Sequence, residues 1–160
     1  MLYFAYGSNL DPRQMRARCP TSTFVHRAVL RAHALAFTRW SPRRGCGVAD
    51  VVPDPDAHVW GSVYALDEAD VARLDACEVY VPGRAANGYE RVSARVFVDG
   101  EAASPVDVMT YRVCERSPVP LTPSASYMEH LVSGAQHWGL PPGYVDALRA
   151  VEVLQFGADA

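Results

Sequence analysis

Strand-like segments fill most of the chain before about residue 113, whereas the segment after about residue 125 is helical. Val92, Ala94 and Val96 alternate with polar residues, as in a strand, while the apolar residues between Met128 and Trp138 follow a helical period. Strands and helices do not alternate as they do in folds with a parallel sheet. The pattern therefore predicts an α+β fold with a small, mostly antiparallel, closed β-barrel-like sheet and flanking helices.

The expected boundaries follow from periodicity and from turn and capping residues. Asp11 and Asp67 are suitable N-caps, and Pro12 is suited to the first helical position. A chain of 160 residues is expected to form one domain with a core that needs no disulfides. The expected strands are 2–6, 24–30, 34–37, 48–52, 58–66, 92–98 and 106–113, and the expected helices are 11–18, 67–77, 128–138 and a short one near 144–151.

The N-terminal strand stops abruptly at Gly7, Ser8 and Asn9, just before the first helix. Such a turn directs several backbone N–H groups toward one point, which favours an anion or a carbonyl oxygen. Gly7 lets the backbone approach a ligand closely, and Ser8 and Asn9 add short hydrogen-bonding side chains. The same residues also suit an ordinary strand-to-helix turn, so the motif alone leaves both interpretations open.

Glu78 stands at the end of the expected middle helix, on the face that carries Val71 and Leu74. If the helix continues to Glu78, its carboxyl group points inward. Burial and the helix dipole then both raise its pKa, as a general acid or base near neutral pH requires. If the helix ends at Cys77, Glu78 faces solvent instead. Periodicity does not choose between the two.

Composition excludes several classes of function. The formal net charge of −3 gives no general attraction to nucleic acid or to an anionic membrane. All fifteen basic residues are arginine, which excludes lysine chemistry. No stretch is long enough to span a bilayer, and no basic region precedes the first apolar run, so we expect a cytoplasmic protein. The cysteines form no metal-binding pair, and we expect reduced thiols and no metal site.

Two motifs resemble those of the gamma-glutamylcyclotransferase family. Tyr6-Gly-Ser-Asn-Leu10, directly after an aromatic strand, is similar to its signature loop. Leu74-Asp-Ala-Cys-Glu78, followed by a loop and Gly88-Tyr-Glu-Arg-Val92, is similar to the motif in which a leucine-aspartate pair precedes the catalytic glutamate. A weaker likeness runs from Tyr127 to Glu152. One departure is Val79, where the family commonly has glycine.

This resemblance implies a fold, a reaction and a site. The reaction would convert a γ-glutamyl amine or amino acid to 5-oxoproline and free amine, without metal or organic cofactor. The partner would be a small-molecule γ-glutamyl substrate, neither nucleic acid nor membrane. Glu78 would be the catalytic acid and base, and the substrate-binding residues would be Tyr6, Gly7, Ser8, Asn9, Leu10, Tyr89 and Tyr127.

Several alternatives stay open. The pocket could bind a γ-glutamyl compound or another small carboxylate without turnover, or Glu78 could activate water in an amide hydrolase. The Gly7-Ser8-Asn9 turn could bind the α-carboxylate or the oxyanion. The sequence does not define the amine part of the substrate, the pathway or the role of the 79–87 loop. It also leaves the oligomeric state open, and a homodimer is one alternative. Arg39, Arg43 and Arg44 could recognise an acidic leaving group, although we favour simple solvation because loop arginines are usually exposed.

Overall fold

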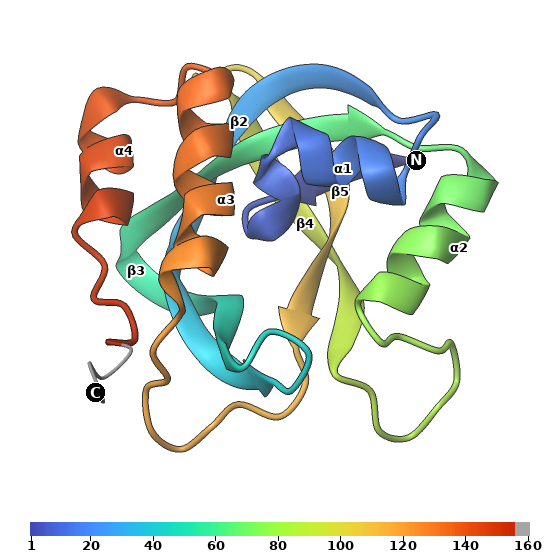
Figure 1. Cartoon of the computed structure of the whole chain (residues 1–160). Helices are drawn as coiled ribbons and strands as arrows, with labels where there is room; N and C mark the ends of the chain where they lie inside the picture. The colour runs from blue at the N-terminus through green and yellow to red at the C-terminus, as the bar shows by residue number, and fades with distance from the viewer. Residues whose placement is uncertain (156–160) are drawn as a thin grey trace.

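The computed structural model describes residues 1–155 and contains the expected mixture of strands and helices (Figure 1). Asp11 and Asp67 cap helices α1 and α2 through their side chains, as their sequence context predicts. In chain order the elements are β1 (Leu2–Ala5), a 3-10 turn (Ser8–Leu10), α1 (Pro12–Arg18), β2 (Thr23–Ser41), β3 (Cys46–Ala65), α2 (Glu68–Cys77), β4 (Tyr89–Val98), β5 (Pro105–Val113), α3 (Ala125–His137) and α4 (Pro142–Arg149).

The five strands form a closed barrel in the order β1-β3-β2-β4-β5. Four of the neighbouring pairs are antiparallel, and the barrel closes where β1 meets β5 in parallel, with Tyr3 opposite Met109. This arrangement confirms the prediction of an α+β fold with a mostly antiparallel closed sheet. Closure leaves few unpaired strand edges, which protects a small sheet from pairing with other chains.

Strands β2 and β3 are much longer than the sequence pattern indicated. The four separate strands expected at 24–30, 34–37, 48–52 and 58–66 are two continuous ones, joined as one long hairpin. Pro53 and Pro55 were expected to end a strand, but both lie within β3, at a position where its pairing with β2 is irregular. There the register jumps from Arg31 opposite His58 to His33 opposite Pro53, and Ala32 between them has a φ of 55°. Prolines are tolerated in sheets at such irregular positions.

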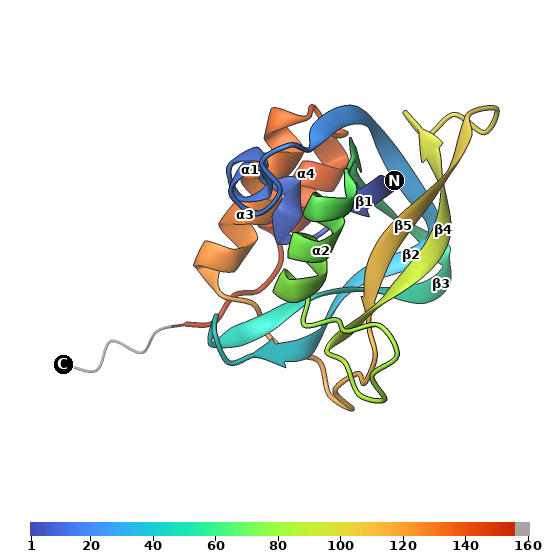
Figure 2. The same ribbon diagram turned by 90° about the vertical axis from the view of Figure 1, so that its right-hand side faces the viewer.

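The helices cover the barrel unevenly. Figure 2 shows α1, α3 and α4 together on one side of the molecule, with β4 and β5 on the opposite side. Helix α3 packs directly on the 3-10 turn, because a Cβ atom at Gly134 would lie 2.3 Å from the backbone of Leu10. The indole Nε1 of Trp138 also donates to the carbonyl oxygen of Leu10, at 3.0 Å. The turn that follows β1 is thus held from behind by a helix more than a hundred residues away. None of the helices within residues 1–155 combines the length and the apolar character needed to cross a membrane.

Candidate active site

A cavity opens where the turn after β1 meets the end of α2 and the inner faces of β3, β4, β5 and α3. It is mainly aromatic and polar, and Glu78 supplies its carboxylate. Its walls are formed by Tyr3, Tyr6, Gly7, Ser8, Asn9, Ala49, Glu78, Tyr89, Tyr111 and Tyr127. The structure therefore brings Glu78 together with six of the seven residues proposed from sequence to bind substrate.

Glu78 faces the interior even though the last helical residue of α2 is Cys77. Its backbone N–H donates to the carbonyl of Leu74 at 2.9 Å, so Glu78 forms the C-cap of the helix and still follows its course. The side chain is only 16% exposed. Of the two sequence alternatives, the helix does end at Cys77, but the carboxyl group points inward. The physical reason is that a C-cap residue keeps the direction of the last turn.

The backbone after Glu78 explains this sharp exit from the helix. The N–H of Tyr80 donates to the carbonyl of Asp75 at 2.9 Å, and that of Val79 donates to the carbonyl of Ala76 at 3.3 Å. These two bonds form a Schellman motif, whose C′ residue takes a left-handed conformation and is usually glycine. Here that residue is Val79, with a φ of 54°. The one departure from the family motif therefore falls at a position where a β-branched side chain is strained.

The environment of Glu78 favours a carboxyl group that can exchange a proton. Burial raises the pKa of Glu78, and the nearby guanidinium groups of Arg18, Arg44 and Arg39 and the amide of Asn9 partly oppose this rise. The contact to Arg18 is long, with 3.6 Å between Nη1 and Oε1. The shorter bond of the same Nη1 atom, 2.8 Å, goes to Oδ1 of Asn9. Glu78 is therefore not locked in a tight internal ion pair.

The side chains of Ser8 and Asn9 hold the turn in place. Ser8 Oγ accepts from Gln14 at 2.6 Å, and Asn9 Oδ1 accepts from both Arg18 and Gln14. The amide nitrogen of Asn9 is left to face Tyr3 Oη at 3.0 Å and Glu78 Oε1 at 3.4 Å. Gly7 lies against the opposite wall, where an added Cβ would come within 3.3 Å of the Tyr127 hydroxyl. An added side chain would therefore crowd the Tyr127 hydroxyl, which would have to shift by a few tenths of an ångström.

The tyrosine hydroxyls around the cavity fall into two kinds. Those of Tyr6, Tyr89 and Tyr111 donate to protein acceptors, namely the Tyr111 carbonyl, the Ala49 carbonyl and the Asp75 carboxylate. By contrast, the oxygen of Tyr127 accepts from the backbone N–H of Ala49 at 3.0 Å, and the oxygen of Tyr3 accepts from Asn9. Within residues 1–155 neither hydroxyl donates to a protein acceptor, so Tyr127 and Tyr3 each keep a proton for a ligand. Burial raises the pKa of Tyr127 to about 12, which keeps it a donor.

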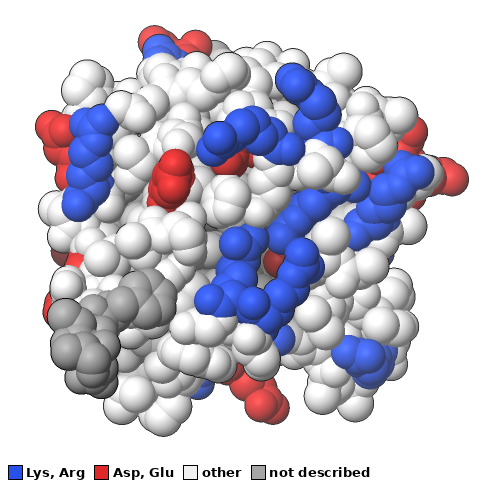
Figure 3. Space-filling view, in the orientation of Figure 1, with Lys and Arg blue, Asp and Glu red and all other residues white. Residues whose placement is uncertain are grey.

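Three arginines line a cleft that continues the cavity outward. Arg18, Arg39 and Arg44 share this cleft with Ser8, Glu78, Tyr89 and Tyr127. Figure 3 shows basic side chains gathered around a hollow on this face. Only Arg43 is an exposed loop arginine of the kind expected from sequence. For Arg39 and Arg44 that interpretation is wrong, because both side chains are half-buried and line the cleft, Arg39 from the end of β2 and Arg44 from the turn between β2 and β3.

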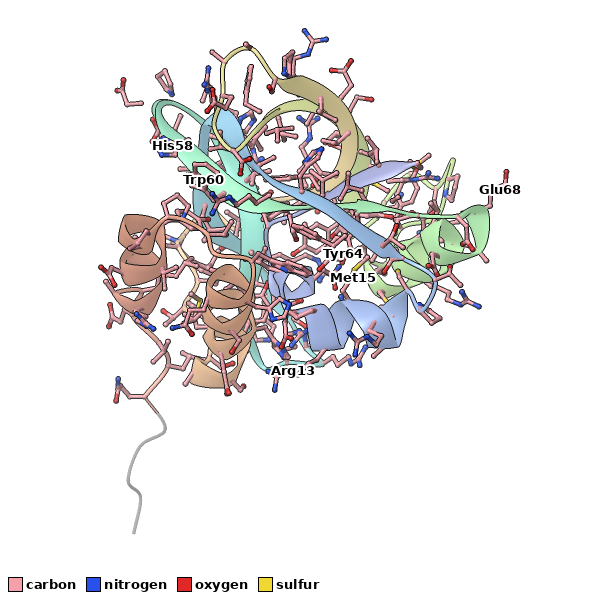
Figure 4. The ribbon with its side chains drawn as sticks, turned by 90° about the horizontal axis from the view of Figure 1, so that it is seen from above. Arg13, Met15, His58, Trp60, Tyr64 and Glu68 are labelled. Carbon is pink, nitrogen blue, oxygen red and sulfur yellow. The ribbon has the colours of Figure 1, made fainter. Side chains whose placement is uncertain are left out.

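Helix α1 presents Gln14 and Arg18 to the turn because its opposite face is anchored in the core. Met15 is almost fully buried, and Figure 4 shows it in the interior near Tyr64, whereas Arg13 points outward. Gln14 and Arg18 are four residues apart and so share a face. Among residues 1–155 no group of three His, Cys, Asp or Glu side chains is arranged to hold a metal ion.

Comparison with known proteins assigns the chain to a family. The model of the AIG2-like family matches residues 58–148. The gamma-glutamylcyclotransferase of Mus musculus is 30% identical over 159 residues, which cover 97% of this chain and 80% of the mouse protein. That of Homo sapiens is 29% identical over 155 residues, which cover 94% and 78%. The chain belongs to the gamma-glutamylcyclotransferase family. A solved structure described as gamma-glutamyl cyclotransferase superposes with a TM-score of 0.86 at 27% identity, covering 98% of this chain and 90% of that one.

One of the residues expected to bind substrate lies outside the cavity, and the cavity has lining residues that the motifs did not indicate. Leu10 does not line the cavity; it is fully buried beneath α3, because the 3-10 turn rotates its side chain into the core. Tyr3 lies in β1, three residues before Tyr6, and could have been found by extending the first motif toward the N-terminus. Ala49 and Tyr111 reach the cavity only through strand register, for which the sequence carries no local signal.

Proposed function

We propose that this protein is a gamma-glutamyl cyclotransferase that converts a γ-glutamyl compound to 5-oxoproline and a free amine. The observation that carries the proposal is the meeting of Glu78 with the Gly7-Ser8-Asn9 turn in one cavity, with 3.4 Å between Asn9 Nδ2 and Glu78 Oε1. A single inward carboxyl group beside hydrogen-bond donors suits a reaction in which the substrate supplies its own nucleophile. The names of the related proteins point to the same reaction.

The chemistry requires one bond to form and one to break. Glu78 takes a proton from the α-ammonium group, and the resulting amine attacks the γ-carbonyl carbon to form the five-membered ring. The attacking nitrogen loses its second proton as the amide C–N bond breaks, and Glu78 passes both protons in turn to the leaving nitrogen, which departs as the ammonium form of the amine. No water is consumed. A carboxyl group whose pKa is raised by burial is suited to both transfers.

The remaining groups would hold the bent substrate. The free hydroxyl protons of Tyr127 and Tyr3 supply donors on two sides of the cavity. The backbone N–H groups of the turn at Ser8 and Asn9 supply further donors for the α-carboxylate or for the developing oxyanion. Because the chain must bend before it can cyclise, fixing amine and carbonyl in contact removes much of the entropic cost.

A panel of γ-glutamyl compounds, with products identified by mass spectrometry, tests the proposal. Release of 5-oxoproline is expected; free glutamate would indicate an amide hydrolase, and unchanged ligand a binding protein. We expect Glu78→Gln to lower kcat by about 10²- to 10⁴-fold, the usual contribution of general acid–base catalysis, in a protein that circular dichroism shows to be folded. Full activity in this variant would rule out the role of Glu78. Gly7→Val should raise KM by closing the space against Tyr127.

We also propose that the protein works in the cytoplasm. Its four cysteines are free, and Cys19 and Cys46 are buried, as is usual in a reducing compartment. Localisation of the tagged protein by fractionation would test this.

A further inference from the structure

The cleft outside the cavity carries more positive charge than the family reaction requires. Arg18, Arg39 and Arg44 line it, and Glu78 is the single carboxylate among its lining residues. All three guanidinium groups are near enough to Glu78 to act on its pKa. If every group is charged, the site has two positive charges in excess.

Arg44 is held in place without a carboxylate partner among residues 1–155. Its Nη2 atom donates to Gln14 Oε1 at 2.8 Å and to Ser8 Oγ at 3.3 Å. The guanidinium carbon lies 5.0 Å from the ring centre of Tyr127. Burial lowers the pKa of Arg44, and the neighbouring Arg18 and Arg43 act in the same direction. Arg44 is half-buried, and a partly desolvated charge held by neutral groups is favoured further when an anion joins it.

Arg39 flanks the same cleft from the end of β2. Its guanidinium group lies over the ring of Tyr89, 5.6 Å from the centre, and presses against Gly88, where an added Cβ would fall 2.7 Å from Nη2. Among residues 1–155 no hydrogen bond or ion pair joins it to a carboxylate. Its position is therefore set by packing, and its donors remain for a ligand.

We propose that the leaving portion of the substrate is an acidic amino acid, so that the preferred substrates are γ-glutamyl-glutamate and γ-glutamyl-aspartate. This inference rests on the proposed function and defines the part of the substrate which that function leaves open. The γ-glutamyl group itself carries one ammonium and one carboxylate and is neutral overall. The two excess positive charges then match a leaving amino acid with two carboxylates. Arg39 binds the side-chain carboxylate, and Arg44 binds the α-carboxylate, because guanidinium groups are well suited to carboxylates.

Three substrates that differ in charge test this assignment. γ-Glutamyl-glutamate has the acidic side chain, γ-glutamyl-glutamine is nearly the same shape but neutral there, and γ-glutamyl-ε-lysine presents a zwitterion. We expect kcat/KM to be about 10- to 100-fold higher for the glutamate compound than for the glutamine compound, as for one charge-assisted contact worth about 1.5–3 kcal/mol. The preference should weaken as salt is added.

Arginine variants test whether Arg39 recognises the side-chain carboxylate of the leaving amino acid. Arg39→Gln should reduce the glutamate-to-glutamine preference to about threefold or less, while Arg39→Lys keeps part of it. Arg43→Gln, which changes an exposed arginine in the adjoining turn between β2 and β3, is the matched control and should leave the preference unchanged. Because each variant is judged by the ratio of two substrates, a general loss of folding or activity does not imitate the effect.

The outcomes separate this inference from the proposed function. If the glutamine or lysine compound is turned over as well as the glutamate compound, the reaction stands and the acidic specificity is wrong. An unchanged ratio in Arg39→Gln likewise overturns the role of Arg39. If none of the three compounds releases 5-oxoproline but another γ-glutamyl compound of the panel does, the acidic specificity is wrong and the reaction stands; if no compound of the panel does, both fail.

Discussion

Asn9 and Glu78, sixty-nine residues apart, meet with 3.4 Å between the amide nitrogen and one carboxylate oxygen. The amide cannot turn over without cost, because its oxygen already accepts from Arg18 and Gln14. The nitrogen is thereby directed at the carboxylate and favours its charged form. Burial acts in the opposite sense, so the pKa of Glu78 is set by a balance between burial, which raises it, and the nearby arginines and Asn9, which lower it.

Arg18 is the strongest of the charges that oppose the raised pKa of Glu78. Replacing it with methionine should therefore raise this pKa further. Since the reaction needs Glu78 deprotonated in the free enzyme, kcat/KM falls as pH decreases through that pKa, and the acid limb should move to higher pH. The pH dependence of kcat/KM measures the shift. Arg16→Met, an exposed change on the same helix, is the control. An acid limb that stays in place would contradict the assignment.

Ala49 gives Tyr127 and Tyr89 opposite hydrogen-bonding roles. Its N–H donates to the Tyr127 oxygen and its carbonyl accepts from the Tyr89 hydroxyl. Tyr127→Phe and Tyr89→Phe should each cost about 1 kcal/mol of stability, because each leaves one backbone group of Ala49 without its partner. Of these two tyrosines Tyr127 is the one with a hydroxyl proton for substrate, so its loss should reduce kcat/KM about tenfold or more and that of Tyr89 much less. Urea unfolding and steady-state kinetics measure the two effects, and equal kinetic losses would disprove this distinction.

The sequence predicted those parts of the molecule that depend on capping residues, turn residues and helical periodicity. The caps at Asp11 and Asp67, the turn after β1 and the inward side of α2 all follow from a few adjacent residues. The long β2–β3 hairpin did not, because the bulge opposite Ala32 depends on pairing between distant residues.

The residues of the site likewise fall into those that local motifs indicate and those that only the tertiary structure brings together. Glu78, Tyr6 and Gly7 were visible in motifs, whereas Ala49, Tyr111 and the cleft arginines reach it through tertiary structure. Asp75 is a further case. A residue that suits an exposed helix end is buried, where it accepts from Tyr111 at 2.5 Å and pairs with Arg91 at 3.2 Å.

Gly134 keeps α3 in contact with the turn that carries Ser8 and Asn9. In Gly134→Ala the new methyl group would lie 2.3 Å from the Leu10 carbonyl, so the helix must move away. We expect a loss of about 1–3 kcal/mol in stability, as for other overpacked sites, together with reduced activity. Gly143→Ala is the matched control: it also lies in a helix but has open space around it, and alanine should stabilise it slightly. Thermal unfolding measures the Tm of both variants. Similar Tm values for the two would contradict the close packing of α3 on the turn.

Val79 holds the left-handed position that ends α2, where glycine would be free of strain. For an L-residue this conformation costs about 1–2 kcal/mol of conformational free energy. Glycine avoids that strain but lowers the stability by about 0.5–1 kcal/mol, because it makes the unfolded chain more flexible. Val79→Gly should therefore stabilise the protein by up to about 1 kcal/mol. Val81→Gly is a matched control, because Val79 and Val81 are almost equally exposed, at 47% and 46%, and only Val79 has a positive φ. Glycine at position 81 should destabilise the protein. Urea unfolding compares the two, and a Val79→Gly protein weakened as much as the Val81→Gly protein would show that the helix end is not strained.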